Sequence, residues 1–224
     1  MNFKKEFWEK KIIGWEDGRY SLNKTDSNKL ENFSDKLSSS LIHRQKIALK
    51  YLKPFIENSN IVELGCGSGL LTKSFIELKC KSYTGYDISE KAIERALDIS
   101  KKNNFPANIN FFALDINDIK VDEKIDVVFS LGLLDWLDEN EIQKIFISFN
   151  NAKHLHSISE NRKFNLYIFL HKLYVFLSYG FKSKGYKPTY HTLDDIKNLY
   201  NKNPESLEIV RDKKLKFGAF IKNF

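Results

Sequence analysis

The sequence predicts a doubly wound α/β fold with a mostly parallel, seven-stranded sheet and helices on both faces. Two observations support this fold class. From residue 61 onward, short runs of β-branched and aromatic residues alternate with helical patterns, which is the signature of βαβ units. Near the C-terminus, two alternating apolar and polar segments flank a charged turn, which predicts a closing antiparallel hairpin.

The length of the chain favours one domain, because 224 residues can bury one substantial core. We therefore expect a single domain over residues 1–224, with four parts. They are an N-terminal helical cap (1–58), a core (59–160), a helical lid insertion (161–192), and a C-terminal helix with the hairpin (193–224). The polar stretch 24–40 is expected to be a connection.

Seven strands are expected, each bounded by turn-forming or charged residues. Five of them form the body of the sheet, at residues 60–64, 82–86, 109–113, 125–130 and 155–159. The last two form the hairpin, at residues 207–211 and 217–221, with Asp212, Lys213 and Lys214 in the turn between them.

Helices are expected between these strands. The first follows the glycines at residues 70–78, and the second covers residues 89–101 with Ser89 as its N-cap. A third covers residues 139–151, where the apolar residues recur on one helical face. Before the first strand, a helical pattern over residues 40–53 is stopped by Pro54.

The composition excludes several classes of protein. No stretch approaches the roughly 18 to 20 apolar residues of a membrane-spanning helix, and the N-terminus lacks the apolar core of a secretory signal, so a cytoplasmic protein is expected. Cys66 and Cys80 lack metal-ligand spacing, so we expect free thiols and no metal. The net charge of +7 suits an anionic partner, but the lysines are scattered and form no long basic run.

A glycine-rich turn follows the first strand. Gly65, Gly67 and Gly69 are spaced as in a loop that lets the backbone approach a bulky ligand, and a helix begins directly after them. Glu63 stands two residues before the loop, and Asp87 ends the second strand, where a carboxylate can accept both hydroxyls of a ribose. Dinucleotide dehydrogenases have a different spacing, with a glycine at the position of Leu70.

Four successive motifs together resemble those of class I S-adenosylmethionine-dependent methyltransferases, which have a Rossmann-like fold. The motifs are Val62-Glu63-Leu64-Gly65-Cys66-Gly67-Ser68-Gly69, Tyr83-Thr84-Gly85-Tyr86-Asp87-Ile88-Ser89, Phe112-Ala113-Leu114-Asp115-Ile116 and Asp126-Val127-Val128-Phe129-Ser130. The resemblance spans about residues 55 to 160.

The resemblance implies an enzyme with S-adenosyl-L-methionine as cofactor. In this family, the glycine loop holds the methionine part, the acid after the second strand holds the ribose and an acid after the third strand holds the adenine. The implied cofactor-binding residues here are Glu63, Gly65, Cys66, Gly67, Gly69, Asp87, Ile88, Asp115, Ile116 and Ser130. As alternatives, Glu63 and Asp115 are strand-end caps, Asp87 is a turn residue, and Cys66 fills space within the loop.

The methyl acceptor is less constrained. The segment from Ser130 to Trp136 lacks both the Pro-Pro-aromatic motif of DNA amino-methyltransferases and the Pro-Cys of cytosine-C5 enzymes, which argues against nucleic acid. We therefore expect O- or N-methylation of a small biosynthetic metabolite, with a sugar, lipid-linked or tetrapyrrole-like acceptor. The alternatives are an RNA (tRNA or rRNA) methyltransferase and a non-catalytic cofactor-binding or partner module. The oligomeric state is left open.

A segment after the fifth strand, over residues 164–177, is apolar almost all round a helix and must be covered. It is either a lid or core helix, or a helix that contacts a membrane surface or a lipid-linked acceptor. The second alternative is helped by the nearby lysines Lys172, Lys182, Lys184 and Lys187.

Methyl transfer is an in-line displacement, so a general base is needed only where the acceptor loses a proton. His156 and Glu160 are the first candidates, because they lie at the end of the fifth strand. The other polar candidates are His171, Tyr190 and His191, and Trp8, Trp15 and Tyr20 either close over the cofactor or pack in the core.

Overall fold

The computed structural model describes residues 3–20, 42–121, 124–161, 186–200, 203–215 and 218–224. Residues 162–185 of the predicted lid insertion, with helix 164–177 and His171, and the polar connection 24–40 lie outside these residues. Lys172, Lys182 and Lys184 do so as well.

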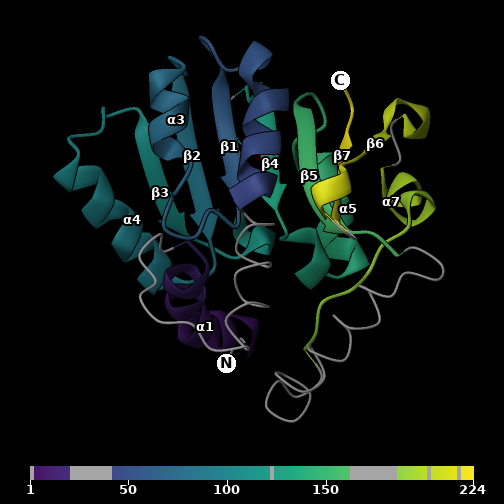
Figure 1. The fold of residues 1–224 in the computed structure, drawn as a ribbon, viewed down its shortest axis with the longest axis horizontal. Coiled ribbons are helices and arrows are strands. Elements are labelled where there is room, and N and C mark those ends of the chain that lie inside the picture. The colour runs from purple at the N-terminus through teal and green to yellow at the C-terminus, as the bar shows by residue number, and fades with distance from the viewer. Residues whose placement is uncertain (1–2, 21–41, 122–123, 162–185, 201–202, 216–217) are drawn as a thin grey trace.

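Seven strands form one sheet in the order β3-β2-β1-β4-β5-β7-β6 (Figure 1). They are β1 (Asn60–Leu64), β2 (Ser82–Asp87), β3 (Ile109–Ala113), β4 (Val127–Leu131), β5 (Lys153–Ser159), β6 (Glu208–Arg211) and β7 (Gly218–Lys222). The first five strands are parallel, while β7 is antiparallel to both β5 and β6. The predicted fold class and hairpin are confirmed.

Six helices accompany the strands in the described residues. They are α1 (Phe3–Tyr20), a helix over residues 42–52, α3 (Thr72–Glu77), α4 (Glu90–Lys102), α5 (Glu139–Ser148) and α7 (Leu193–Leu199). Short 3-10 turns complete the chain: η1 (Lys53–Phe55), η2 (Ile116–Asp118), η3 (Leu134–Trp136), η4 (Pro204–Ser206) and η5 (Lys213–Leu215).

The helix boundaries follow capping side chains. Ser89 caps α4, as predicted, because its hydroxyl accepts a hydrogen bond from the Ala92 amide at 3.2 Å. Asp138 caps α5 and forms a reciprocal capping box with Glu141. Each cap satisfies an amide that the first helical turn leaves without a partner.

The core lies on both faces of the sheet. On one face, helix 42–52, α3 and α4 pack with buried residues such as Leu52, Phe75 and Phe129. On the other face, α5 and α7 pack with residues such as Ile142, Ile196 and Ile221. This gives the three layers of a doubly wound fold.

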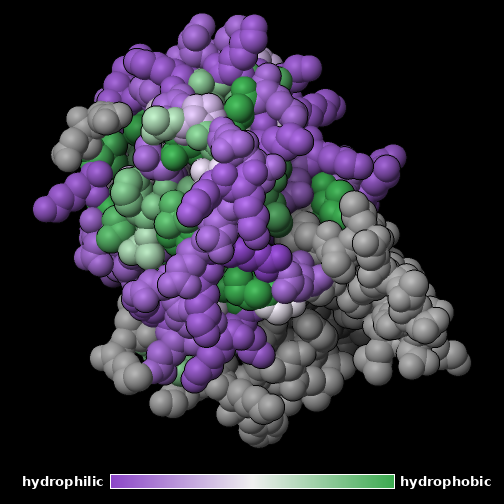
Figure 2. All heavy atoms as spheres, turned by 90° about the vertical axis from the view of Figure 1, so that its left-hand side faces the viewer, coloured by the Kyte–Doolittle hydropathy of each residue, from purple (hydrophilic) through white to green (hydrophobic). Residues whose placement is uncertain are grey.

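The β3 side of the sheet carries hydrophobic patches on a mainly hydrophilic surface (Figure 2). The exposed large hydrophobic side chains of α4 and the β3 end are Leu97, Phe112 and Leu114. Phe112 stacks on Tyr86 of the neighbouring strand, with ring centroids 5.7 Å apart. Phe112 and Leu114 closely precede Asp115, the residue predicted to contact an adenine ring.

Helix α1 lies across the end of the sheet at which β1 runs into the glycine turn (Figure 1). It is attached to α4 by an ion pair between Lys5 and Glu90 and by the carboxylate of Glu9, which accepts hydrogen bonds from the amides of Glu90 and Lys91. Helix α1 therefore covers one end of the sheet.

Candidate functional site

The glycine turn after β1 has an unusual backbone. The φ angles of Gly65, Gly67 and Gly69 are +69°, +53° and +70°, a region that L side chains rarely adopt. At Gly69, an added Cβ would also lie 2.7 Å from the ring of Phe111. The conformation and the packing therefore both require glycine at this position.

Asp87 connects the glycine turn to the end of β2. Its carboxylate accepts hydrogen bonds from the amides of Gly67 and Ser89, both at 2.9 Å. Burial raises the pKa of Asp87 to about 6, against the lowering effect of these two hydrogen bonds. The charges of Glu16 and Glu9 raise it further. The acid predicted to bind ribose thus lies against the loop predicted to bind the same ligand.

Glu63 is buried below the turn. The Tyr83 hydroxyl donates a hydrogen bond of 2.5 Å to its Oε2 atom. Burial raises the pKa of Glu63 to about 8, and the charges of Asp87 and Glu16 add to the increase. The three carboxylates of Glu16, Glu63 and Asp87 therefore interact with one another around the turn.

Cys66 is buried within the turn, and its Sγ atom lies 3.5 Å from the carbonyl oxygen of Gly67. Burial raises the pKa of the thiol well above its ordinary value, so the thiol is protonated at neutral pH. Its Sγ would lie only 2.8 Å from a Cβ at Gly85, which indicates close packing of the loop on β2. This environment favours the space-filling interpretation over chemical reactivity.

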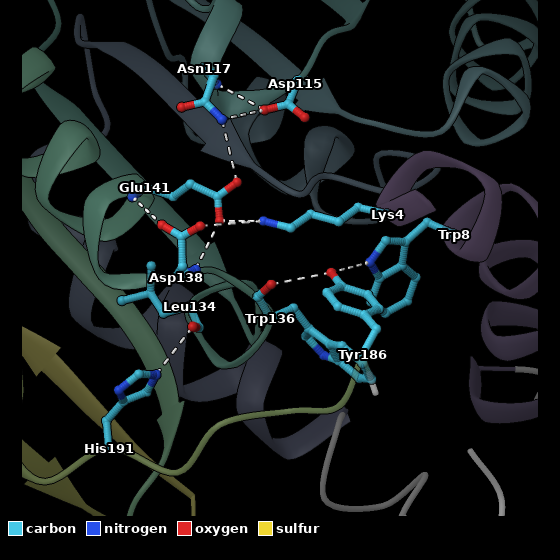
Figure 3. Close-up of polar contacts among 10 residues, drawn as sticks. All are labelled: Lys4, Trp8, Asp115, Asn117, Leu134, Trp136, Asp138, Glu141, Tyr186 and His191. Carbon is cyan, nitrogen blue, oxygen red and sulfur yellow. Dashed lines mark hydrogen bonds and ion pairs between the residues drawn. The ribbon is translucent and has the colours of Figure 1, made fainter. Parts of the chain in front are cut away.

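Asp115 follows β3 and caps the turn η2. Its carboxylate accepts hydrogen bonds from the amide and the side-chain nitrogen of Asn117, at 3.0 and 3.1 Å. The side-chain nitrogen of Asn117 also donates a hydrogen bond to Glu141, which forms a 2.5 Å ion pair with Lys4 of α1 (Figure 3). The next residue, Ile116, is half-buried and packs against the core under α5. Asp115 thus acts as a cap, which leaves its predicted adenine role untested.

An aromatic cluster closes the space between α1 and the segment after β4. The Trp8 indole donates a 3.2 Å hydrogen bond to the Tyr186 hydroxyl, which donates to the carbonyl oxygen of Trp136 at 3.2 Å (Figure 3). The ring centroids of Trp8 and Trp136 are 4.9 Å apart, and Phe7 lies 5.2 Å from Tyr186. Trp8 therefore packs where closure over a ligand was predicted, whereas the side chains of Trp15 and Tyr20 are not described.

A chain of hydrogen bonds runs through the interior between β4 and β5. His154 Nε2 lies 2.9 Å from the Phe149 carbonyl oxygen and must donate to it. His154 Nδ1 then accepts from His156 Nε2 at 3.1 Å, and His156 Nδ1 accepts from the Ser130 hydroxyl at 2.9 Å. This direction holds for neutral rings, and both are neutral at pH 7 because burial lowers their pKa values, that of His154 to about 4.

These contacts change the interpretation of three predicted residues. His156 and Ser130 are fully buried, and the chain uses the Ser130 hydroxyl and both ring nitrogens of His156. Glu160 is also buried, and the Arg211 guanidinium binds it through three hydrogen bonds of 2.6 to 3.0 Å. The geometry therefore favours structural roles for these side chains.

Asp135 and Arg44 are two further polar residues whose side chains reach the segments where β4 and β5 end. Asp135 is buried and accepts hydrogen bonds from the amide and hydroxyl of Ser159 at 2.8 and 2.7 Å. Burial raises its pKa, while the amide and hydroxyl of Ser159 and the charge of Arg44 lower it. Arg44 Nη1 lies 2.7 Å from where a Cβ of Gly132 would be, just after β4. Its Nε atom is buried with no hydrogen-bond partner in the described part of the chain.

The other polar candidates have contacts of their own. His191 is buried, and its Nε2 lies 3.2 Å from the Leu134 carbonyl oxygen (Figure 3). Burial and the charge of Asp135 raise the pKa of Tyr190 to about 12. Within the described ranges, no cluster of three His, Cys, Asp or Glu side chains could hold a metal ion.

A family described as a methyltransferase domain matches residues 56–207, from the last residues before β1 to the residue before β6. This match covers more than half of the chain. The chain belongs to the methyltransferase domain family. The matched residues include the glycine turn, Glu63, Asp87 and Asp115.

Solved methyltransferase structures share the fold of this chain at low sequence identity. A magnesium protoporphyrin IX methyltransferase from Synechocystis PCC 6803, crystallised with S-adenosylhomocysteine, has a TM-score of 0.71 and 16% identity, over 98% of this chain and 96% of that chain. The N-methyltransferase NodS from Bradyrhizobium japonicum WM9 has a TM-score of 0.62 and 14% identity, over 99% and 97% of the two chains.

Relatives are also found by sequence. A malonyl-[acyl-carrier protein] O-methyltransferase 1 from Ilyobacter polytropus is 27% identical over 169 residues, which are 71% of this chain and 59% of that protein. A probable protein arginine N-methyltransferase 6.1 from Oryza sativa subsp. indica is 29% identical over 97 residues, 43% of this chain and 23% of that protein. This chain thus spans less than two thirds of the length of these relatives.

The sequence did not predict that two residues before β1, Glu16 and Arg44, reach the site. Glu16 reaches the glycine turn from α1, where Oε1 accepts a hydrogen bond from the Ser68 amide at 2.8 Å. Arg44 reaches Gly132 from helix 42–52. The spacing of Glu9, Ile12 and Glu16 along one face of α1 indicates a packed helix, but it cannot identify the loop on which that face packs.

Proposed function

We propose that this chain transfers the methyl group of S-adenosyl-L-methionine to a small metabolite. The observation that carries the proposal is the pair of hydrogen bonds from the amides of Gly67 and Ser89 to Asp87. They hold a carboxylate beside a glycine turn at the ends of parallel strands, where ligands bind in doubly wound folds. The family match and the methyltransferases that resemble this chain add support.

The residues of the turn fit the proposed cofactor. The cofactor supplies a methyl group on a positively charged sulfur, together with an ammonium group and a ribose. The charge of Glu16 raises the pKa of both Glu63 and Asp87, and the charge of Asp87 also raises the pKa of Glu63, so a cationic ligand would be stabilised beside them. Asp87 is the candidate acceptor for the ribose hydroxyls, and the exposed edge beside Asp115 is the candidate adenine contact.

The chain's contribution to the reaction is positioning and the exclusion of water. Phe7, Trp8, Trp136 and Tyr186 form an apolar wall between α1 and the segment after β4. Such a wall suits a small acceptor better than a polyanion, because its aromatic rings offer packing rather than phosphate contacts. A small-molecule acceptor is therefore preferred over RNA, despite the net charge of +7.

An acceptor with an anionic oxygen is favoured by Arg44. Its guanidinium reaches the segment after β4, and its Nε atom retains an unused donor. A guanidinium pairs well with a carboxylate because its donors match both oxygens. A carboxylate acceptor would also need no general base, since it has no proton to lose. We propose O-methylation of a carboxylate ahead of N-methylation.

Calorimetric titration of the protein with S-adenosylmethionine and S-adenosylhomocysteine tests the cofactor. Incubation with methyl-labelled S-adenosylmethionine and a metabolite extract then tests the acceptor, since a methyl ester releases volatile methanol in alkali and an N-methyl product does not. Absence of cofactor binding would refute the enzyme proposal. Binding without transfer to any extract would support a non-catalytic module, and salt-sensitive binding of tRNA with transfer to it would support the RNA alternative.

No helix in the described ranges is long and apolar enough to cross a membrane. We propose a cytoplasmic enzyme, and contact of the 162–185 segment with a membrane surface or a lipid-linked acceptor remains part of the proposal. Sedimentation with anionic vesicles measures this contact directly. A protein that stays in the supernatant at all lipid concentrations would contradict it.

A further inference from the structure

Helix α1 places the carboxylate of Glu16 directly on the glycine turn. Oε1 accepts a hydrogen bond from the Ser68 amide at 2.8 Å, and it would lie 2.2 Å from a Cβ at Gly67. Glu16 is only 5% exposed, so this carboxylate is removed from bulk water. It occupies the space that the missing side chain of Gly67 leaves open.

The second oxygen of this carboxylate has an unused acceptor site. Oε2 is buried and has no hydrogen-bond partner within the residues that the structure describes. Nη1 of Arg95 lies 3.9 Å from Oε2, which is an ion-pair distance but too far for a hydrogen bond, and Nη2 of the same guanidinium binds Asp17 at 2.7 Å. A buried carboxylate oxygen without a donor is unfavourable, so a donor from a ligand would stabilise it.

Two other carboxyl groups, those of Glu63 and Asp87, lie near Glu16. Glu63 and Asp87 lie close enough for the Glu16 carboxylate to raise the pKa of both. Their hydrogen bonds go to Tyr83 below the turn and to the amides of Gly67 and Ser89. A ligand that brings both positive charge and N–H donors would relieve the repulsion and satisfy Oε2 together.

We infer that Glu16 is a cofactor-binding residue whose Oε2 accepts a hydrogen bond from the ammonium group of S-adenosylmethionine. Of the two cationic groups of the cofactor, the ammonium carries three donors and the sulfonium none, so the ammonium is the one that brings both positive charge and a hydrogen bond to Oε2. Helix α1 is then one wall of the cofactor site, held in place by the contacts of Lys5 and Glu9 with α4. This inference rests on the proposed binding of S-adenosylmethionine at the glycine turn.

The matched variants Glu16→Gln and Asp17→Asn test this role. Both remove one negative charge from adjacent positions of α1, but only Glu16 contacts the turn, whereas Asp17 is exposed and binds Arg95. Glutamine keeps an oxygen for the Ser68 amide and places an NH₂ group toward the ligand. Calorimetry should use three ligands: S-adenosylmethionine, S-adenosylhomocysteine, and methylthioadenosine, which lacks the ammonium group.

For Glu16→Gln, we expect the Kd values of S-adenosylmethionine and S-adenosylhomocysteine to rise by about 10- to 100-fold, since one charged hydrogen bond is lost. The Kd of methylthioadenosine should stay within about twofold of the wild-type value, because its binding does not use the ammonium contact. Asp17→Asn should leave all three Kd values nearly unchanged. Chemical unfolding of both variants checks that α1 and the turn remain folded.

Three results would overturn the inference. Unchanged affinities in Glu16→Gln would show that Glu16 has only a structural role. Tighter binding of all three ligands would show that the Glu16 side chain occupies the site and must be displaced by the cofactor. An equal loss of affinity in Asp17→Asn would show that the effect of Glu16→Gln comes from the total charge of α1 and not from a contact of Glu16. If the wild-type protein binds none of the ligands, the cofactor proposal itself fails, and that outcome is separate from the other three.

Discussion

The Tyr83 hydroxyl donates a 2.5 Å hydrogen bond to Glu63 beneath the glycine turn, where both side chains are buried. Tyr83 thereby holds Glu63 in place below the loop. Because burial raises the pKa of Glu63 to about 8, the folded protein retains a proton that an unfolded chain would release near pH 4.5. The stabilising effect of this proton is complete below pH 4.5 and is lost as the pH rises through 8.

This relationship predicts a pH-dependent stability. Between pH 6 and pH 8, the free energy of unfolding should fall by up to about 1.4 kcal/mol per pH unit through Glu63. Urea unfolding at the two pH values should show a smaller fall for Glu63→Gln, which cannot ionise. The control Glu94→Gln removes an exposed carboxylate of α4 and should keep the wild-type slope. Equal slopes for Glu63→Gln and the wild type would contradict the prediction.

Replacement of Asp87 by Asn should weaken the binding of S-adenosylmethionine by roughly 1.5 to 3 kcal/mol. The amide lacks the charge for the proposed ribose contact, and its NH₂ group would oppose a backbone amide of Gly67 or Ser89. Titration calorimetry at pH 7.5 measures the change, and Asp98→Asn on the exposed face of α4 is the control. In the wild type, the Kd should also rise as the pH falls below about 6, where Asp87 takes up a proton.

An unaltered Kd for Asp87→Asn would contradict a ribose role and would support the alternative that Asp87 only organises the turn. In that case, Asp87→Asn should instead lower the free energy of unfolding. The two measurements therefore separate the interpretations.

The order of strands and helices could be predicted from the sequence because it depends on local patterns. The glycine turn, the Ser89 cap and the alternating hairpin are each specified by residues close together in the chain. The errors at element ends are small: the strand expected at residues 155–159 begins two residues earlier, at Lys153. This shift moves His156 from the second residue of the expected strand to the middle of β5.

The site was less predictable because its contacts join residues that are far apart in the sequence. Glu16 is 52 residues from its partner Ser68, and Arg211 is 51 residues from Glu160. No spacing rule connects such pairs, since they depend on how α1 and β6 pack against the sheet. An isolated glutamate at a strand end therefore suggested catalysis, whereas the fold gives Glu160 an arginine partner.

The glycine turn should tolerate no side chain at Gly69. Alanine there would adopt a positive φ and push its Cβ against the ring of Phe111 at 2.7 Å and 2.9 Å. We expect Gly69→Ala to lower the free energy of unfolding by roughly 1 to 3 kcal/mol, from backbone strain and crowding. The matched control is Gly14→Ala in α1, where no atom lies within 4 Å of the new Cβ, and a gain of about 0.5 to 1 kcal/mol is expected.

Urea unfolding of the two glycine variants gives a direct comparison. A Gly69→Ala protein as stable as the wild type would show that the turn relaxes easily. The crowding argument would then be wrong for this position.

The buried chain from Ser130 through His156 and His154 to Phe149 predicts the consequences of His156→Gln. Glutamine cannot both accept from Ser130 and donate to His154 with the geometry of the ring, so at least one buried group loses its partner. The free energy of unfolding at pH 7 should fall by roughly 1 to 3 kcal/mol. His43→Gln is the control, because His43 is only partly buried and binds the loop residue Asp212 at 3.0 Å, a contact worth little.

The pH dependence gives an independent test of the same chain. Because burial lowers the pKa of both imidazoles, that of His154 to about 4, their contribution to stability is present above pH 6.5 and is lost as the pH falls toward 4. His156→Gln should therefore show a shallower loss of stability on acidification than the wild type. Methyl transfer per folded molecule should change less than about tenfold if the role of His156 is structural, as its burial and its bonds to Ser130 and His154 favour. A stable variant that has lost more than about 100-fold in turnover would instead restore His156 as the general base that its position in the sequence suggested.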